Sequence, residues 1–526
     1  NMVTGAALAT TNRLPVLLFP SDQFATRVPD PVLQQLEDPT SLDVSVNDAF
    51  RPVSRFFDRI NRPEQLIPSL LNAMRVLTDP AETGAVTIAM PQDVQAEVFD
   101  WPVELFRKRV WHVRRPVPEP AALERAVALI KAAKRPLIIA GGGTIYAGAS
   151  EELRALATAT GIPVGDTQAG KGAINFDHPS AVGGVGSTGC DSGNHIADKA
   201  DLIIGVGTRY SDFTTASKTQ FKNPDVKFVN INVTPFDAAK ESAEMVVADA
   251  CEALAALKEA LADYHVEAAY SEEITAEKEA WIKATERCYH LDHGPLPAQT
   301  EVFGALNELM GEEDVVINAA GSMPGDLQAL WQARSPLQYH VEYAFSCMGY
   351  EVPAAMGVKL ARPEAEVVAI VGDGTYQMLP MELATVVQEN IKVIYVLLQN
   401  YGFCSIGALS ESRGSQRFGT KYRQRGEGSH LADEQVIDGV DIAANARSWG
   451  LDVLEVHTIA EFKEAYRKAE ASDRPTMIHI ETDLYGPNPP GSSWWDVPVS
   501  GVSELESTQR AYEEYLRDRK PQRHYL

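Results

Sequence analysis

The motif Gly372-Asp373-Gly374-Thr375 follows directly on the apolar run Glu366–Val371 and carries the clearest chemical signal in the sequence. A tight turn that leads from a buried strand into a helix presents backbone N–H groups, and a diphosphate fits such a turn. Gly374 lets the backbone approach phosphate oxygens without an intervening Cβ, and Pro380 suits the first turn of the expected helix. Asp373 adds negative charge at the same place, so a hard cation such as Mg2+ must lie between the carboxylate and the phosphates. The motif therefore predicts a metal-bridged diphosphate site.

Further ligands for this cation follow the next expected strand. The stretch from Thr375 to Leu398 holds one helix and one buried strand, which is the length of a single crossover. Asn400 is therefore expected near Asp373, at the carboxyl edge of the sheet, where open α/β sheets bind ligands. The Gly402 carbonyl provides a third protein oxygen, and phosphate oxygens with a water complete an octahedron. A purely structural glycine turn is the alternative interpretation.

The elements that must position these residues alternate between short apolar runs and longer amphipathic stretches, which is typical of parallel sheets covered by crossover helices. We expect an α/β protein with domains at 1–117, 118–265 (Rossmann-like) and 266–490, and a tail at 491–526. The expected strands are Leu14–Phe19, Ala85–Ala89, Pro136–Ala140, Leu202–Val206, Lys227–Ile231, Val315–Asn318, Glu366–Val371 and Lys392–Leu398. The expected helices include Asn1–Asn12, Pro63–Leu77, Ala121–Ala133 and Ser271–Arg287. The middle glycines do not form a dinucleotide fingerprint, because Tyr210 stands where that fingerprint needs glycine.

Motif, spacing and domain order together resemble the thiamine-diphosphate enzymes of the pyruvate oxidase and acetolactate synthase group. The resemblance implies thiamine diphosphate and Mg2+ as cofactors, with 1–117 as the C-terminal half of the pyrimidine-binding domain and 266–490 as the diphosphate-binding domain. The implied metal ligands are Asp373, Asn400 and the Gly402 carbonyl. The implied cofactor-binding residues are Gly321, Ser322, Met348, Gly372, Asp373, Gly374, Thr375, Asn400 and Gly402. Met348 is implied to prop the cofactor into its bent shape, although a methionine taken alone more often fills a core. The family often has Asn where this sequence has Gln399, but Asn400 occupies the ligand position.

Several stretches resemble one branch of this group more closely, the trihydroxycyclohexane-1,2-dione hydrolases of myo-inositol breakdown. They are Ser21–Arg27 with Pro29–Leu36, His340–Tyr350, Asn400–Arg423 and Ser493–Pro498. The resemblance implies a hydrolase acting on a carbon–carbon bond. It would cleave 3D-(3,5/4)-trihydroxycyclohexane-1,2-dione with water to give 5-deoxy-glucuronate. A 2-oxo acid decarboxylase or acetolactate synthase is the nearest alternative, and a non-catalytic protein that keeps the fold is a second.

Polar side chains near the cofactor loops are needed to bind a substrate with several hydroxyl groups. The candidates are His340, Glu342, Asp326 and Gln328, with Lys421 and Arg423 on the segment after the metal loop. Each of these residues also suits a structural role. Trp494 and Trp495, in a Pro- and Gly-rich tail, either form a lid over the site or dock on the body of the protein.

The residue that activates the cofactor has no counterpart in this sequence. In the resembling family it is a glutamate of the first domain, and the resemblance places it upstream of Asn1. We expect the chain to begin partway through that domain, so that the strands at Leu14–Phe19 and Ala85–Ala89 lack sheet neighbours and expose apolar edges. The chain alone is then expected to be inactive and prone to aggregation. The group's sites lie between subunits, which implies a homodimer or homotetramer.

Composition narrows the partners and the location. A formal net charge of −25 leaves no basic surface for nucleic acid or anionic membrane. The five cysteines are scattered and form no CxxC pair, which favours a reducing, cytoplasmic location. No apolar run approaches the roughly 18 residues that span a bilayer. The expected partner is therefore a small molecule.

Overall fold

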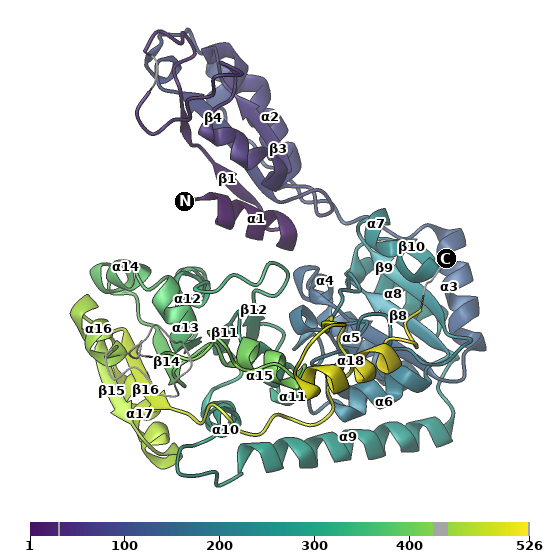
Figure 1. Ribbon diagram of the computed structural model, residues 1–526. Helices are drawn as coiled ribbons and strands as arrows, with labels where there is room; N and C mark the ends of the chain where they lie inside the picture. Colours follow the sequence, from purple (N-terminus) through teal and green to yellow (C-terminus); the bar gives the residue numbers. More distant parts are fainter. Residues whose placement is uncertain (30–31, 424–439, 524–526) are drawn as a thin grey trace. The chain divides into compact units, whose positions relative to one another are not determined.

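The computed structural model describes residues 1–29, 32–423 and 440–523 (Figure 1). Positions 30 and 31 of the resembling stretch Pro29–Leu36 lie outside this range. The chain divides into two compact units, Asn1–Pro116 and Val117–Leu526, and each is described by itself. In the described part of the chain, no helix is long and apolar enough to cross a membrane.

The first unit is a small parallel sheet with two α-helices. Its strands are β1 (Val16–Leu18), β2 (Ser21–Asp22), β3 (Phe56–Arg59) and β4 (Ala85–Pro91), and its α-helices are α1 (Val3–Asn12) and α2 (Leu66–Leu77). β4 pairs with β1 and β2 and also with β3. The expectation that the strands at Leu14–Phe19 and Ala85–Ala89 lack sheet neighbours is therefore wrong, because β1 and β4 pair with each other and β4 also pairs with β3. Val86 and Ile88 on this strand pack against Ala73 and Val76 of α2, and all four side chains are buried.

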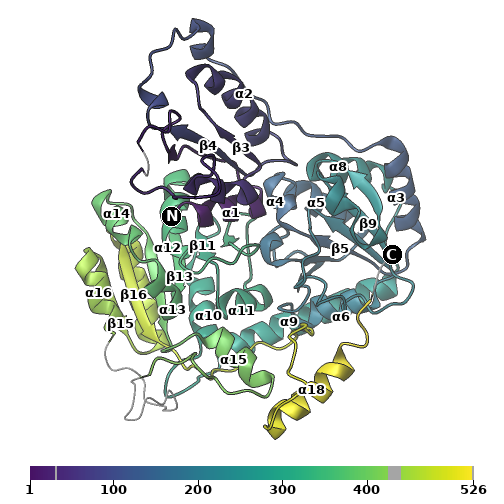
Figure 2. The ribbon, with the colours of Figure 1, turned by 45° about the horizontal axis from the view of Figure 1, so that its top comes forward.

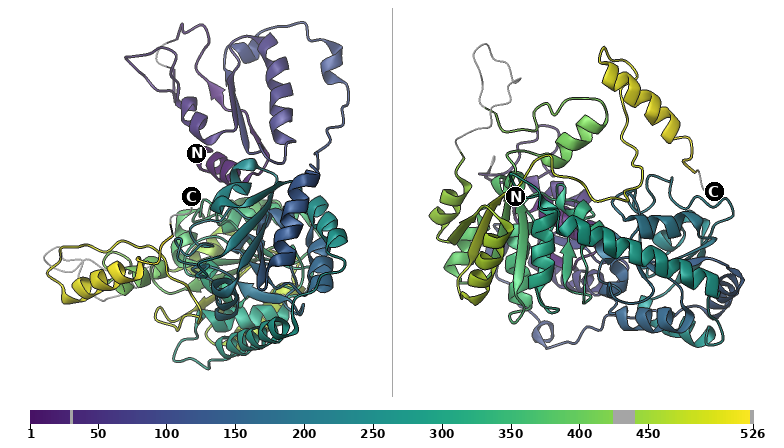
Figure 3. Two further views of the ribbon diagram at one scale, coloured as in Figure 1. Left: turned by 90° about the vertical axis from the view of Figure 1, so that its right-hand side faces the viewer. Right: turned by 90° about the horizontal axis from the view of Figure 1, so that it is seen from below.

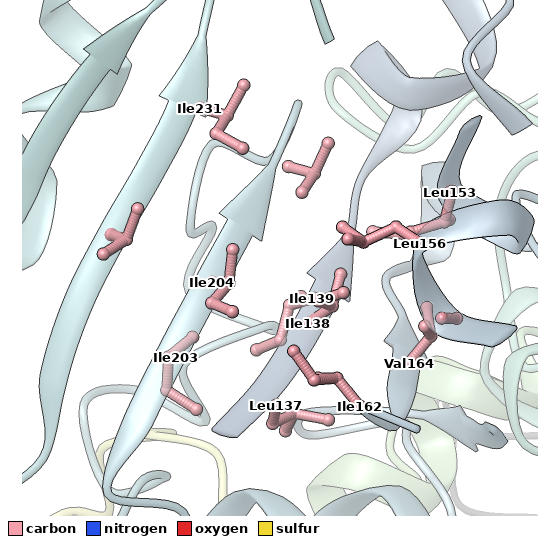
Figure 4. Close-up of a cluster of buried hydrophobic side chains, with 14 of the residues drawn as sticks. Leu137, Ile138, Ile139, Leu153, Leu156, Ile162, Val164, Ile203, Ile204 and Ile231 are labelled. Carbon is pink, nitrogen blue, oxygen red and sulfur yellow. The ribbon is translucent and has the colours of Figure 1, made fainter. Parts of the chain in front are cut away.

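The second unit begins with a six-stranded parallel sheet in the order β10-β9-β8-β5-β6-β7. Its strands are β5 (Pro136–Ala140), β6 (Val164–Asp166), β7 (Ala181–Gly184), β8 (Leu202–Val206), β9 (Lys227–Asn232) and β10 (Glu244–Val247). Its helices are α3 (Pro120–Ala132), α4 (Gly142–Tyr146), α5 (Ser150–Thr160), α6 (Asp191–Lys199), α7 (Pro235–Ala238) and α8 (Ala250–Ala260). Figure 4 shows Ile138 on one strand and Ile203 and Ile204 on the neighbouring one, in the same buried cluster as Leu153 and Leu156 of α5. Strands buried on both faces explain the continuous apolar runs in this part of the sequence.

The glycines of this middle region are required for close backbone packing. A Cβ on Gly141 would lie 2.4 Å from the Gly207 carbonyl oxygen, and one on Gly143 would lie 2.7 Å from the Gly207 Cα. The loops after β5 and β8 therefore touch through their main chains. This contact accounts for the glycines without a dinucleotide.

The third sheet is also parallel and six-stranded, in the order β12-β11-β13-β14-β16-β15. Its strands are β11 (Val315–Asn318), β12 (Tyr339–Val341), β13 (Val367–Gly372), β14 (Ile394–Gln399), β15 (Asp452–Val456) and β16 (Thr476–Glu481). Its helices are α10 (Gln299–Leu309), α11 (Met323–Leu330), α12 (Glu351–Ala361), α13 (Asp373–Met378), α14 (Glu382–Gln388), α15 (Cys404–Ser412), α16 (Ile442–Trp449) and α17 (Ile459–Ala471). After β11 the chain forms β12 on one side of β11 and then β13 on the other side of β11. The strand order therefore reverses between β11 and β13, which is where doubly wound sheets bind ligands.

Alternate residues of the third sheet face different helical layers. Val367, Ala369 and Val371 of β13 belong to the core that contains residues of α12, α14 and α16. Val368 and Ile370 belong to the opposite core, with residues of α10, α11 and α17. This two-sided burial holds the strand ends that carry the metal motif in fixed positions.

A long helix and the tail complete the second unit. They are α9 (Ala268–Tyr289), the long teal helix in the right-hand view of Figure 3, and α18 (Glu506–Asp518). Trp281 of α9 donates from Nε1 to the Ala329 carbonyl at 2.8 Å, and Tyr289 donates from its hydroxyl to the Leu330 carbonyl at 2.7 Å. The helix is thus hydrogen-bonded to the end of α11.

The segment Ser493–Asp496 of the tail docks on the middle region, and Figure 2 shows the tail continuing into α18. The Trp494 carbonyl accepts a hydrogen bond from Ser187 Oγ at 3.1 Å, and Trp495 Nε1 donates to Asp212 Oδ2 at 2.7 Å. The Trp495 ring also lies 4.8 Å from the Phe213 ring, measured between centroids. Of the two alternatives for these tryptophans, the contacts favour docking.

A buried ion pair joins the middle region to the end of α11. Lys171 Nζ lies 3.2 Å from Asp166 Oδ2 and 3.4 Å from the Trp331 carbonyl oxygen. The two charged side chains are only 2% and 9% exposed. Asp166 Oδ1 is buried without a hydrogen-bond partner, and burial raises the pKa of Asp166 even though Lys171 acts in the opposite direction. The pair is therefore costly to break.

Candidate active site

The predicted metal ligands meet at the carboxyl ends of two neighbouring strands. β13 and β14 pair in parallel with Gly372 opposite Leu398, so Asp373 and Asn400 each follow directly on a strand end. Asp373 Oδ2 accepts hydrogen bonds from Asn400 N at 3.2 Å and from Tyr401 N at 2.6 Å. The spacing argument is confirmed in this respect, because one crossover does bring Asn400 back to Asp373.

The donor set around Asp373 fits a hard cation. Asp373 is buried, and burial raises the pKa of its carboxyl to about 6, although backbone N–H groups of Tyr401 and neighbouring residues act in the opposite direction. Asn400 Oδ1 is buried and has no hydrogen-bond partner. A desolvated carboxylate beside an unpartnered amide oxygen is the arrangement that Mg2+ would satisfy. Among the described residues, no three His, Cys, Asp or Glu side chains gather as a metal cluster, so amide and carbonyl oxygens would have to complete the shell.

Gly402 lies where its backbone must pass another segment closely. It pairs with Lys421 in an antiparallel bridge, and Phe403 N donates to the Thr420 carbonyl at 2.7 Å. A Cβ on Gly402 would lie 2.4 Å from that carbonyl oxygen. Glycine at this position therefore lets the loop after β14 fold back on itself.

The loop after β11 leaves open space where a diphosphate would lie. Gly321 has a φ of +97°, and a Cβ built there would meet nothing within 4 Å. Gly374 is more enclosed, since its Cβ would lie 2.9 Å from the Phe403 ring. The Ser322 hydroxyl donates to Gln299 Oε1 at 3.1 Å. The residues present thus fit a bound diphosphate at the β11–β13 reversal.

The helix after the motif is shorter than expected. α13 begins at Asp373 itself and ends at Met378, and Pro380 lies between α13 and α14. The expectation that Pro380 occupies the first turn of the helix after the motif is therefore wrong. Its carbonyl instead accepts a hydrogen bond from Leu383 N at 3.0 Å, at the start of α14.

Glu351 is a site residue that the sequence analysis missed. It is fully buried at the start of α12, where its Oε2 accepts a hydrogen bond from Thr375 Oγ1 at 3.1 Å and its Oε1 accepts one from Ala320 N at 3.4 Å. Thr375 Oγ1 in turn accepts a hydrogen bond from Gly349 N at 2.5 Å. Burial raises the pKa of Glu351 to about 7. The available signal was a single acid in the otherwise apolar first turn of this helix, directly after Tyr350.

Met348 lies in the turn that leads into α12, and it is half-buried. Its neighbour Gly349 has a φ of +89° and is tied to Thr375 by the hydrogen bond described above. The turn that carries Met348 is therefore fixed against the motif loop.

The candidate substrate residues fall into separate places. His340 Nε2 lies 2.7 Å from the Tyr350 hydroxyl, and burial lowers the pKa of His340. Glu342 holds the same loop, because its carboxylate accepts from Phe345 N at 2.9 Å and from Cys347 N at 2.7 Å. His340 and Glu342 thus contact residues that precede and follow Met348 in the sequence.

The other candidate substrate residues contact groups outside the loop that carries Met348. Asp326 Oδ2 accepts from Gln299 Nε2 at 2.5 Å. Gln328 faces the middle region, where Thr188 Oγ1 donates to its Oε1 at 2.5 Å. Lys421 Nζ lies 5.2 Å from the centre of the Tyr485 ring, and Arg423 Nη2 donates to the Arg417 carbonyl at 3.4 Å.

Comparison with known proteins defines the class of enzyme. The central domain of thiamine pyrophosphate enzymes matches residues 123–257, and their C-terminal thiamine-pyrophosphate-binding domain matches residues 319–480. The second match contains the predicted metal ligands and the loops after β11 and β13, where the diphosphate is expected. The fold is therefore that of a thiamine-diphosphate enzyme, and the predicted fold class and cofactor are confirmed.

More detailed similarity defines the family. The chain is 45% identical to the 3D-(3,5/4)-trihydroxycyclohexane-1,2-dione hydrolase of Bacillus cereus (strain AH820), over 100% of this chain and 85% of that protein. It is 46% identical to hydrolase 2 of the same name from Bacillus cereus (strain ZK / E33L) and 45% identical to the one from Bacillus thuringiensis (strain Al Hakam), with the same coverage. The chain belongs to the 3D-(3,5/4)-trihydroxycyclohexane-1,2-dione hydrolase family.

Proposed function

We propose that this enzyme cleaves 3D-(3,5/4)-trihydroxycyclohexane-1,2-dione with water to give 5-deoxy-glucuronate, a step of myo-inositol degradation. The observation that carries the proposal is the 45% identity to proteins of that name along the entire chain. In this reaction the bond between the two carbonyl carbons breaks. One carbon becomes a carboxylic acid and the other an aldehyde, so the product contains one water more than the substrate.

The residues that would hold the cofactor follow the ends of three strands, β11, β13 and β14. Asp373, Asn400 and the Gly402 carbonyl would hold Mg2+, which is supported by the hydrogen bond from Asn400 N to Asp373 Oδ2 at the ends of two paired strands. Gly321, Ser322, Gly374 and Thr375 would hold the diphosphate, and Gly372 would end the strand beneath it; Met348 would support the cofactor's bent shape. When bound, thiamine diphosphate supplies a carbon nucleophile and an electron sink for breaking a bond next to a carbonyl.

The substrate would lie beside the loop that carries Met348. His340, with its lowered pKa, is a neutral imidazole at pH 7 and can exchange hydrogen bonds with sugar-like hydroxyl groups. Tyr350 shares this position through its 2.7 Å contact with His340. Glu342 would act indirectly, since its carboxylate is occupied by the loop's own N–H groups.

The organisation of the whole protein belongs to the proposal as well. Residues 1–117 would belong to the pyrimidine-binding domain, 118–265 would form the middle domain, 266–490 the diphosphate-binding domain and 491–526 the tail. The active enzyme would be a cytoplasmic homodimer or homotetramer. Mass measurement of the native protein in solution distinguishes the two assemblies.

Substrate turnover tests the function directly. The protein is incubated with thiamine diphosphate, Mg2+ and the dione, and products are followed by mass spectrometry. We expect a product heavier than the dione by one water, formed only when the cofactor is present. Pyruvate in place of the dione is the control for the alternative. Consumption of pyruvate with the dione left intact would instead assign a 2-oxo acid decarboxylase or acetolactate synthase.

A further inference from the structure

A chain of three polar side chains lies behind the loop after β11. Ser322 Oγ donates to Gln299 Oε1 at 3.1 Å, and Gln299 Nε2 donates to Asp326 Oδ2 at 2.5 Å. Ser322 ends the diphosphate loop, Gln299 opens α10 and Asp326 lies on α11. The side chains therefore connect a proposed cofactor contact to a carboxyl group that is 8% exposed.

The direction of these hydrogen bonds is dictated by the carboxylate. An ionised Asp326 can only accept, so Gln299 must turn its NH2 group toward Asp326 and its carbonyl toward Ser322. The hydroxyl of Ser322 has a single proton, and this proton is then committed to Gln299. With Asp326 ionised, Ser322 offers an approaching phosphate only lone pairs.

Protonation of Asp326 reverses the direction of the two hydrogen bonds that link it through Gln299 to Ser322. A neutral carboxyl can donate to Gln299 Oε1, which lets the amide turn and donate from Nε2 to Ser322 Oγ. The Ser322 proton is then released from Gln299 and can go to a phosphate oxygen, with the Cys404 thiol as the competing neighbour. This hydrogen bond to a charged group is worth more than one between neutral partners.

The surroundings of Asp326 favour the neutral form. Its side-chain partner is the uncharged Gln299, and in the described part of the chain no Lys, Arg or His forms an ion pair with it. The titratable groups that face it are the thiols of Cys288 on α9 and Cys404 on α15. Burial raises the pKa of Asp326 to about 7, which places the change of state within the physiological range.

We propose that Asp326, acting through Gln299, sets the direction of the Ser322 hydroxyl and so couples diphosphate binding to the uptake of one proton. Asp326 is thus a positioning residue for the cofactor. The inference rests on the proposed role of Ser322 as a diphosphate contact. It replaces the earlier hypothesis that Asp326 binds substrate.

The test is the pH dependence of cofactor binding by the protein. Titration calorimetry with thiamine diphosphate and Mg2+, in buffers of different ionisation enthalpy, gives both affinity and protons taken up. We expect the Asp326→Asn variant to gain affinity relative to wild type by about tenfold between pH 6 and pH 8, the value of one charged hydrogen bond. The proton uptake assigned to Asp326 should disappear in the variant. Other groups that titrate in this range, Asp373 and Glu351 included, are present in both proteins and cancel in the ratio.

Two further variants make the test decisive. Gln299→Met cuts the chain while leaving Asp326 in place, and it should remove the same pH dependence. In a Ser322→Ala background, Asp326→Asn should have no further effect, because the hydroxyl that it controls is gone. Retention of the wild-type pH profile and proton uptake in both Asp326→Asn and Gln299→Met would overturn the inference. Failure of the wild type to bind thiamine diphosphate at any pH would overturn the proposed function instead, and the inference with it.

Discussion

Replacement of Asp373 by alanine is expected to abolish magnesium-dependent binding of thiamine diphosphate while the protein stays folded. The Asp373 carboxylate is the only anionic group among the three proposed metal ligands; it is buried and accepts a hydrogen bond from Asn400 N, whose side-chain Oδ1 has no partner. Loss of one member of a buried charge pair costs about 2–5 kcal/mol, which is roughly a 30- to 4,000-fold loss of affinity. The measurement is the cofactor dissociation constant at several Mg2+ concentrations.

Glu364→Ala is the matched control for this variant, because it removes an exposed carboxylate from the same domain. It should bind cofactor like the wild type. Circular dichroism should show Asp373→Ala folded, since Asp373 belongs to neither apolar core of the third sheet. Unchanged cofactor affinity in Asp373→Ala would refute the metal site.

The second large effect concerns stability. Lys171→Met removes the cation from the buried ion pair with Asp166. The Asp166 carboxyl group, whose Oδ1 already has no hydrogen-bond partner, then also lacks a charged partner. Breaking a buried pair in this way costs about 3–5 kcal/mol. We expect a melting temperature lower by roughly 3 to 6 °C for a unit of this size, measured by calorimetry.

Two companion variants separate the charge effect from general damage. Arg474→Met breaks an exposed ion pair with Asp452, whose side chains are 54% and 49% exposed, and it should hardly change the melting temperature. The double variant Lys171→Met/Asp166→Leu removes both charges and should recover much of the loss. A Lys171→Met protein that melts like the wild type would show that the pair contributes little.

Much of the fold follows from local sequence. The strands at Pro136–Ala140, Leu202–Val206 and Val315–Asn318 have the bounds that the apolar runs predict. Strands buried on both faces must be apolar throughout, which makes them visible without any partner. The strand Phe56–Arg59 was not predicted, because half of its residues are charged and its pairing with β4 depends on distant residues.

The candidate site was predictable only where chain topology constrains it. Asp373 and Asn400 meet because one crossover joins neighbouring parallel strands, and the residue spacing contains that information. The contact of Thr375 with Glu351 and that of Gln299 with Asp326 join different loops, and no local pattern encodes them. Gln328 lies close to the diphosphate loop in sequence, yet its side chain faces the middle region.

The docking of the tail has a consequence for the way the protein is made. Trp495 and its partner Asp212 are separated by 283 residues, so the ribosome completes the binding surface long before it supplies the segment that covers it. At a synthesis rate of about 5–20 residues per second, the surface stays uncovered for roughly 14 to 57 seconds. Throughout this interval Phe213, which the Trp495 ring later contacts, is left without that cover. Slow translation of the last part of the message would therefore prolong a vulnerable stage of synthesis.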